Sequence, residues 1–425
     1  MAMEHGYPEI EARFRKSGAA YVASTAVTAT INDAVRTLEL AKRLDPGVVT
    51  ILGGVHPTFM YEEVLTGSSA VDFVVIGEGE ETLRQLLAVL EEGGDPATVP
   101  GLAFRQGERI VTTGSRPLRD NLDDFPAAWD LIEWNLYEYF VIPGSRLGAI
   151  GTSRGCGHDG VTSPQQRFWE KTWRGRSPEK VAEEIDYLHR THGVTVFLLT
   201  DEHPTRDRQR WEELLDRIIG KGIPVRLLME TRSADIVRDG DILWKYRKAG
   251  VIYISIGTQP AGGENGGETA GAKQALDLIH DHGIVSEASF MIGFPDETGE
   301  SVKRTFQLVQ RYNPDNANFL AVTPWPYGEH SAGMADFVKE RDYGKYNLVD
   351  PVIEPKEMSL HQVEVAIVDC YRKFYMAKII DVMTMKDDFR RACMVRFTKL
   401  FMGSSFVFRK LGVGLRAKLG FKAKG

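Results

Sequence analysis

The three cysteines are the first candidates for chemistry, because thiolates bind soft metals and act as nucleophiles. They stand far apart in the chain, at Cys156, Cys370 and Cys393. An odd number at this spacing predicts neither a disulfide framework nor a structural zinc site, and it favours a reducing compartment. His158 and Asp159 closely follow Cys156, so these three side chains could gather a mononuclear metal. A loop whose polar groups are satisfied within the protein is the commoner outcome for so short a run.

Glycines mark two predicted strand ends in the first third of the chain. Apolar runs at 20–28, 48–52 and 71–76 are typical of strands, and 31–44 has the apolar spacing of a helix. Strands that alternate with helices predict a parallel, doubly wound sheet. Ligands in that architecture bind at the carboxyl ends of the strands, where Gly53-Gly54 and Gly77 to Gly79 fall.

A second alternating series follows a stretch rich in Gly, Pro and polar residues. The strands that we expect there are 149–153, 195–200, 225–229, 251–256, 285–292 and 318–323. Such a series predicts a partial or full parallel barrel, with chemistry in the loops after the strands. The predicted α/β organisation is a doubly wound domain over 1–92, a linker over 93–145, a barrel over 146–335 and a helical, basic region over 336–425.

Charge is distributed unevenly along the chain. The 52 Lys and Arg against 59 Asp and Glu give a net charge of −7, so the chain as a whole is not expected to bind nucleic acid. From Phe389 to the end, however, there are ten basic residues and no acidic one. A solvated basic tail is the simpler explanation. Because apolar residues interleave with these charges, the alternative is an amphipathic helix on an anionic membrane surface.

The overall composition predicts a globular protein with a sizeable core, since 43% of the residues are hydrophobic and 26% are charged. No stretch approaches the roughly 20 consecutive apolar residues of a membrane span, and the first residues lack the apolar core of a secretory signal. We therefore expect a cytoplasmic protein, which is membrane-associated if the amphipathic alternative holds.

Several segments resemble one family. Leu52 to Met60 (LGGVHPTFM) and VIGEGEETL from Val75 are similar to the cobalamin-binding domain that precedes certain radical S-adenosylmethionine enzymes. Thr152 to Glu179 resembles their cluster-binding segment, and DEHPT, SIGT, SEASFMIGFPDET and PDNANFLAVTPWPY follow in order. The chain is similar above all to the anaerobic magnesium-protoporphyrin monomethyl ester oxidative cyclase group. This implies a truncated cobalamin-type domain without its first β-α unit and a barrel of the (β/α)6 type.

The resemblance also implies a four-iron, four-sulfur cluster bound by Cys-x3-Cys-x2-Cys in the first barrel loop. Here the three positions read Cys156, Gly160 and Ser163. Glycine offers no side-chain donor, and a serine hydroxyl is a hard ligand that such clusters rarely accept. One thiolate should not hold the cluster, so we expect no deoxyadenosyl radical by the usual route.

The resemblance places five residues near S-adenosylmethionine. Asp201 and Glu202 stand where the family has carboxylates near the amino group, and Arg232 matches an arginine that pairs with the carboxylate. A surface salt bridge explains Arg232 equally well. Ser255 and Gly257 belong to the SIGT segment at the end of the fourth barrel strand.

Other positions depart from the family pattern. His203 and Gln259 each replace a glutamate, and Pro260 to Gly271 has five glycines in twelve residues. Glycine costs roughly 1 kcal/mol per helical residue relative to alanine, so this segment is expected to be a loop. It is either a lid or a repair across a deletion.

For cobalamin, the resemblance places six residues near the corrin or its nucleotide tail: Gly53, Gly54, His56, Thr58, Glu78 and Gly79. The segment GGVHPT is not the Asp-x-His-x-x-Gly motif of base-off cobalamin proteins. We therefore do not expect His56 to bind cobalt.

Aromatic residues favour a large planar substrate such as a tetrapyrrole, although core packing is their commoner role. Those near the predicted barrel mouth are Phe168, Trp169, Trp173, Trp325 and Tyr327.

Four explanations remain open. The chain is an active radical enzyme of the cyclase type, or a relative that binds S-adenosylmethionine or cobalamin and performs polar chemistry such as methyl transfer. It is otherwise a non-catalytic, degenerate subunit that pairs with an intact paralogue. The fourth explanation is that the cluster ligands were removed by engineering.

Overall fold

The structure is a computed structural model that describes residues 6–125, 127–157, 164–258, 271–329 and 331–403. The chain divides into two compact units. The first comprises Met1–Phe125, Gly157–Trp173 and Thr323–Val352, and the second comprises Pro126–Cys156, Arg174–Val322 and Ile353–Gly425. Several predicted features lie outside the described residues, namely His158, Asp159, Gly160, Ser163, Gln259, most of the 260–271 loop and the tail from 404 onward.

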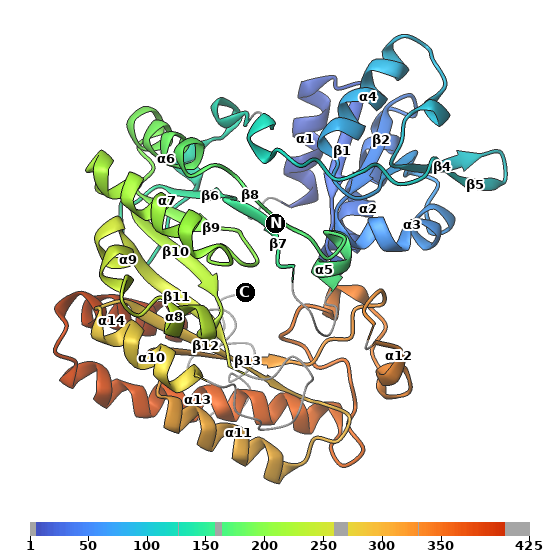
Figure 1. The fold of residues 1–425 in the computed structure, drawn as a ribbon. Helices are drawn as coiled ribbons and strands as arrows, with labels where there is room; N and C mark the ends of the chain where they lie inside the picture. The colour runs from blue at the N-terminus through green and yellow to red at the C-terminus, as the bar shows by residue number, and fades with distance from the viewer. Residues whose placement is uncertain (1–5, 126, 158–163, 259–270, 330, 404–425) are drawn as a thin grey trace. The chain divides into compact units, whose positions relative to one another are not determined.

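The first unit is built on a sheet with the strand order β1-β2-β3-β4-β5 (Figure 1). The strands β1, β2 and β3 are parallel, whereas β4 runs antiparallel to β3 and β5 runs antiparallel to β4. The strands are β1 Tyr21–Thr25, β2 Val49–Gly53, β3 Phe73–Val75, β4 Leu102–Gln106 and β5 Arg109–Thr112. The helices are α1 Tyr7–Ser17, α2 Ile31–Leu44, α3 Val55–Gly67 and α4 Glu80–Glu91.

Helical spacing of apolar residues positions α2 on this sheet. Ile31, Ala34, Leu38 and Ala41 are all buried, at the intervals that place them on one helical face. They join a core that includes Leu52 of β2. The parallel β-α alternation predicted for this region is therefore confirmed.

The stretch predicted as a linker over 93–145 differs from that expectation. Its residues 102–112 form β4 and β5, which extend the first sheet as an antiparallel edge. Leu102 and Ala103 are fully buried there, so this hairpin belongs to the core rather than to a linker. Ahead of β1, the described residues form α1 and no strand.

The second unit contains a parallel sheet with the order β13-β12-β11-β10-β9-β6. Its strands are β6 Leu147–Ile150, β9 Val196–Leu199, β10 Arg226–Thr231, β11 Val251–Gly257, β12 Val285–Ile292 and β13 Asn316–Ala321. Its helices are α6 Pro178–His192, α7 Arg208–Lys221, α8 Ser233–Arg238, α9 Leu243–Ala249, α10 Ala272–Asp281, α11 Gly299–Tyr312, α13 Leu360–Thr384 and α14 Asp388–Gly403. Within the described ranges β6 and β13 do not pair, so the predicted barrel is a partial one.

The two faces of this sheet differ in polarity. Ile254, Ile256 and Phe290 are fully buried in the core that the sheet shares with the helices (Figure 1). The residues that alternate with them, such as Ser255 and Glu287, are less buried and point to the inner face of the barrel. The sequence alternation therefore creates a polar inner surface.

The structure also contains short elements that the sequence did not reveal. They are β7 Ser153–Gly155, which pairs with β8 Trp173–Gly175, and the helices α5 Pro164–Phe168 and α12 Ser331–Met334. Since β7 ends directly before Cys156, it fixes where the cysteine loop begins.

The C-terminal region is helical from Leu360, within the range 336–425 that the sequence assigned to it. Residues 323–352 belong to the first unit, where Asp342 accepts a hydrogen bond from Asn32 at 2.8 Å. Ser359 and Gln362 form a capping box that starts α13. Among the described residues, no helix is both long and apolar enough to cross a membrane.

Candidate functional site

The carboxyl edge of the first sheet brings several predicted residues together. Gly53 ends β2, and Gly54 follows with φ +102°, where an added Cβ would lie 2.6 Å from the carbonyl oxygen of Ala26. Only glycine fits this close approach. The Thr58 hydroxyl donates to the Gly54 carbonyl at 2.8 Å and accepts from the Gly77 amide at 3.0 Å. Thr58 thus ties the turn after β2 to the turn after β3.

The turn after β3 carries Glu78 and Gly79. The Glu78 carboxylate accepts a hydrogen bond from the Arg119 amide at 3.0 Å, and Gly79 precedes the first turn of α4. Gly77 has φ +71°, and no atom lies within 4 Å of the position that its Cβ would take. The backbone of this turn is therefore open to approach by a ligand.

His56 has a different environment. Its side chain is 1% exposed, and Nδ1 lies 3.2 Å from the Thr28 hydroxyl, which is 2.9 Å from the Tyr327 hydroxyl. The rings of Tyr327 and Tyr343 contact it edge-on, with centroid distances of 5.9 and 4.9 Å. Burial lowers the pKa of His56 to about 4, so the imidazole is neutral at physiological pH. His56 therefore contributes to the packing of this edge.

Tyr327 was predicted to lie at the barrel mouth, and the structure places it in the first unit. Its ring stacks on Phe59 at 5.0 Å, and the Arg167 guanidinium lies 4.8 Å above the same Phe59 ring. Arg167 also donates to the Tyr327 carbonyl. Phe168 and Trp169 likewise belong to this unit and contact each other edge-on. The local sequence around Phe59 gives no signal for this cluster.

In the second unit, Asp201 positions the start of the cysteine loop. The amide and hydroxyl of Thr152 donate to its carboxylate at 2.9 and 2.8 Å, and the Ser153 hydroxyl donates at 2.5 Å. Burial raises the pKa of Asp201, while these hydrogen bonds oppose the rise. Because both carboxylate oxygens are engaged within the protein, contact of Asp201 with a cofactor stays a prediction.

The neighbours of Asp201 continue this support. The Glu202 carboxylate accepts from the Gly155 amide at 3.2 Å, directly before Cys156, which is buried and forms no disulfide among the described residues. His203 Nε2 lies 2.5 Å from Asp235, and both side chains are buried. Burial raises the pKa of Asp235, but hydrogen bonds from His203 and Thr205 outweigh it and the pKa is lowered. Residues 201–203 therefore hold in place the backbone that leads into the loop at Cys156.

The donors around Cys156 do not fit a four-iron cluster. Gly160 and Ser163 stand at the other two ligand positions of the motif, and they supply no sulfur. Among the described residues, no group of three or more His, Cys, Asp or Glu side chains could hold a metal ion. We derive no step through a cluster.

Carboxylates that the sequence analysis did not assign line the inner face of the barrel. In the strand register Glu230 is paired with Ser255, Ser255 with Glu287, and Glu287 with Asn316. The Tyr253 hydroxyl donates to Glu287 at 2.5 Å. Burial and the carboxylates of Glu287 and Glu202 raise the pKa of Glu230, although its side chain still reaches solvent. The polar-apolar alternation of 285–292 is the signal that could have indicated Glu287.

Arg232 completes this face with a positive charge. It follows β10 directly and lies two residues beyond Glu230, on the same side of the chain. Within the described ranges, its guanidinium has no hydrogen bond or ion pair. Gly257, paired with Ser289, adds no side chain to this end of β11. The inner face thus offers two carboxylates and a free guanidinium, which suits a ligand that carries both charges.

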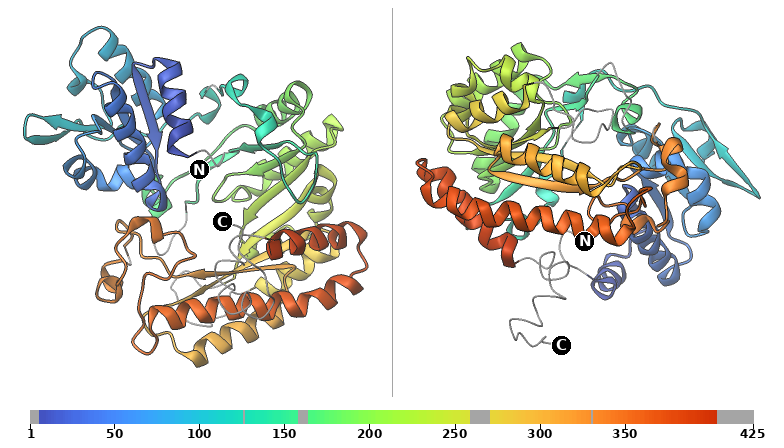
Figure 2. Two further views of the ribbon diagram at one scale, coloured as in Figure 1. Left: turned by 180° about the vertical axis from the view of Figure 1, so that it is seen from behind. Right: turned by 90° about the horizontal axis from the view of Figure 1, so that it is seen from below.

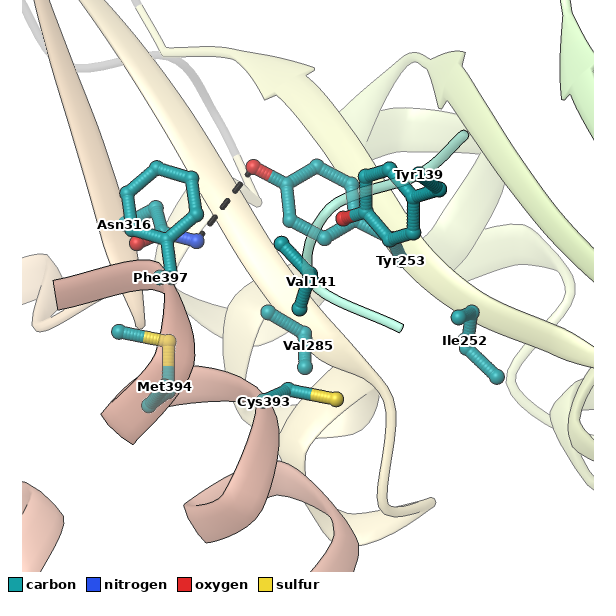
Figure 3. A pocket seen from close by; sticks show the side chains of 9 residues that line it. All are labelled: Tyr139, Val141, Ile252, Tyr253, Val285, Asn316, Cys393, Met394 and Phe397. Carbon is teal, nitrogen blue, oxygen red and sulfur yellow. Dashed lines mark hydrogen bonds between the residues drawn. The ribbon is translucent and has the colours of Figure 1, made fainter. Parts of the chain in front are cut away.

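The opposite end of the barrel is closed. A cavity of about 10 Å³ lies there, with room for about one water molecule. Figure 3 shows the side chains that line it: Tyr139, Val141, Ile252, Tyr253, Val285, Asn316, Cys393, Met394 and Phe397. Beside it Arg390 of α14 pairs with the buried Asp315 at 2.7 Å. A ligand of the inner face therefore enters from the carboxyl ends of the strands.

Comparison with known proteins gives relatives over most of the chain. The model of the B12 binding domain family matches residues 1–87. The anaerobic magnesium-protoporphyrin IX monomethyl ester cyclase of Rubrivivax gelatinosus is 36% identical over 396 residues, covering 91% of this chain and 71% of the relative. This chain covers 65% and 58% of the length of two further cyclases of that name. An uncharacterised methyltransferase of Pyrococcus horikoshii is 28% identical, covering 88% of this chain and 83% of the relative.

The fold also matches a solved structure. The radical S-adenosylmethionine methyltransferase TsrM from Kitasatospora setae superposes with a TM-score of 0.61 over 77% of this chain and 67% of that chain. Sequence identity is 18%, so this likeness concerns the fold alone.

Proposed function

The chain belongs to the B12-binding radical S-adenosylmethionine enzymes of the anaerobic magnesium-protoporphyrin cyclase group, and we propose that it is a cluster-free member that binds S-adenosylmethionine for polar methyl transfer. The observation that carries this proposal is the loop after β7, where Gly160 and Ser163 stand in place of two thiols. The remaining Cys156 alone cannot enclose a four-iron cluster.

Polar methyl transfer requires no electron from a cluster. A lone pair on the acceptor forms the new bond to the methyl carbon, and the carbon–sulfur bond breaks with its electron pair staying on sulfur. The sulfonium becomes a neutral thioether, and the acceptor loses a proton or keeps the positive charge. Reductive cleavage of the same sulfonium would need an added electron. In the family that electron comes from the four-iron cluster, which the missing thiolates would bind.

The charges on the inner face of the barrel support S-adenosylmethionine as the ligand. Glu230 and Glu287 favour its ammonium and sulfonium charges, and Arg232 can receive its carboxylate through two parallel hydrogen bonds. Ser255 lies between the two glutamates in the strand register and can donate to a ribose oxygen. The pKa of Glu230 is raised by nearby negative charge, and a bound cation would relieve this repulsion.

The first unit fits cobalamin at the turns after β2 and β3. Gly53, Gly54 and Gly79 would contact it, and the open backbone of Gly77 leaves space for it. When bound, cobalamin supplies a second carrier for methyl groups. His56 is covered by Tyr327 and Tyr343, so this chain's own contribution is to shape the turn rather than to provide a metal ligand.

For the substrate we propose a tetrapyrrole or another large planar molecule. Support comes from the relatives named for magnesium-protoporphyrin, although the chain spans only part of each. The methyltransferase relative supports the reaction class.

Calorimetry with the metal-free protein tests the proposal. We expect S-adenosylmethionine to bind, and we expect Arg232→Ala to lower its affinity at least tenfold. The matched control is Arg206→Ala, which removes an exposed arginine from a neighbouring loop and should leave the affinity unchanged.

Product analysis decides between the reaction types. Incubation with S-adenosylmethionine, a reductant and a tetrapyrrole acceptor should yield S-adenosylhomocysteine and a methylated acceptor. Stoichiometric deoxyadenosine would contradict the proposal in favour of an active radical enzyme. Binding without any product would instead indicate a non-catalytic subunit.

A further inference from the structure

An apolar stripe on α13 faces away from the core of the second unit. Met376, Ile379, Ile380 and Met383 follow one another at intervals of three, one and three residues, which places them on one helical face. Their exposed fractions are 65%, 45%, 68% and 76%. Large apolar side chains that are exposed together, rather than singly, mark a binding surface.

The opposite side of α13 is fully used by the fold. Phe374 and Tyr371 contact Phe319 of β13, with ring centroids 6.3 and 5.1 Å apart. Figure 2 shows α14 beside α13, and Phe397 of α14 stacks on Tyr375 at 6.2 Å. The stripe is therefore not a core face left open by chance, since the helix is already anchored through its other side.

The charges around the stripe leave a basic excess. The acidic side chains close to it are paired, Asp369 with Arg372 at 2.8 Å and Asp381 with Lys378 at 3.5 Å. Lys373 and Lys386 are exposed and have no ion pair among the residues that the structure describes. Beyond Gly403 the sequence continues with six Lys and Arg residues and no acidic residue.

We propose that the exposed face of α13 docks on the surface of an anionic phospholipid bilayer. Apolar side chains in the stripe would enter the boundary between headgroups and acyl chains, and the basic residues would contact the headgroups. A second copy of this chain fits less well, because two copies would bring their basic excess together. The inference does not depend on the proposed function.

Flotation with vesicles tests the inference on the full chain. We expect the protein to float with vesicles of mixed phosphatidylglycerol and phosphatidylcholine, and not with pure phosphatidylcholine vesicles. Raised salt should weaken binding, because screening shortens the range of the headgroup charge.

Two variants separate the apolar and basic contributions. Ile380→Glu with Met383→Glu should reduce binding at least tenfold, whereas the control Leu131→Glu, at another exposed apolar residue, should leave it unchanged. Replacement of Lys373 and Lys386 by Gln should weaken binding several-fold. Circular dichroism checks that each variant is folded.

Two outcomes would overturn the inference. The first is absence of binding to anionic vesicles. The second is that the variant with Ile380→Glu and Met383→Glu still binds the vesicles, while light scattering shows that these changes dissociate a dimer. That result would mean that the stripe mediates contact between two copies of the chain.

Discussion

The carboxyl edges of the two parallel sheets use their polar residues in different ways. At the edge of β1 to β3, His56, Thr28 and Tyr327 satisfy one another and are buried. At the corresponding edge of the barrel, the side chains of Glu230 and Arg232 have no hydrogen bond within the described part of the chain. The first edge is therefore stabilised by its own contacts, whereas the second keeps charges that a ligand can satisfy.

This difference teaches that a motif at a strand end does not by itself indicate ligand contact. Asp201 and His56 both belong to segments that resemble cofactor sites, yet the protein engages both carboxylate oxygens of Asp201 and the Nδ1 atom of His56. Glu230 belongs to no such motif, and its carboxylate has no hydrogen-bond partner among the described residues. The predictions below test whether the two edges differ in stability and in ligand binding as this comparison requires.

The largest effect is expected from glycine substitution at the first edge. Gly54→Ala places a Cβ 2.6 Å from the Ala26 carbonyl oxygen at φ +102°, so the free energy of unfolding should fall by more than about 3 kcal/mol. The matched change Gly257→Ala, where no atom lies within 4 Å, should have little effect. Denaturant unfolding measures both. Equal losses would show that the two edges are equally packed.

Acid should destabilise the first edge through His56. The folded protein holds the imidazole neutral with a pKa of about 4, against an ordinary 6.5, so the unfolded chain binds the proton first as pH falls. This contribution is complete above the unfolded pKa. It is lost as pH falls from 6.5 to about 4, with a maximum near 3 kcal/mol.

Comparison of the parent chain with His56→Gln isolates this contribution, because His280 also has a pKa lowered to about 4 and titrates in both proteins. The variant should lose less stability between neutral and acidic pH. The same acid dependence in both proteins would mean that His56 is not the buried neutral group described above.

At the second edge, a rise in pH rather than a fall should lower the stability of the folded protein. Burial and nearby carboxylates raise the pKa of Glu230, so its charged form opposes folding as pH rises above the unfolded value. Glu230→Gln should therefore preserve or increase stability at neutral pH while lowering the affinity for S-adenosylmethionine about tenfold, or ~1.4 kcal/mol. Glu300→Gln, on the exposed face of α11, is the control for calorimetry. A loss of stability without loss of affinity would make Glu230 a structural residue.

The smallest effect is expected from removal of one hydroxyl at the first edge. Tyr327→Phe deletes the 2.9 Å hydrogen bond to Thr28 and should cost about 1 kcal/mol in the free energy of unfolding. Tyr187→Phe removes an exposed hydroxyl 3.3 Å from Asp130 and should cost less. If both changes were neutral, the first edge would not depend on its internal hydrogen bonds.

The sequence predicts the regular elements well where side-chain periodicity is strong. The helix at 31–44 and the strand at 285–292 have the predicted bounds, because each alternates buried and exposed positions over many residues. The start of the helix α3 at Val55 was not predicted, since the segment GGVHPT has no helical pattern. The hairpin at 102–112 was missed as part of the sheet because its short strands lie in a stretch rich in turn residues.

The candidate site was predictable only in part. Thr28 and Tyr327 are 299 residues apart, so no local pattern indicates their hydrogen bond. The engagement of Asp201 depends on hydroxyls from a separate strand, 48 and 49 residues earlier. Glu230 and Glu287 become neighbours only through the register of β10, β11 and β12. Long-range pairing, rather than residue type, decides which polar groups remain free.

The most direct test of the central claim is the iron and sulfide content after anaerobic reconstitution. The parent chain should bind far less than four irons per protein, whereas the variant with Gly160→Cys and Ser163→Cys should assemble a brown, reducible four-iron cluster. A stoichiometric, reducible cluster in the parent chain would contradict the account.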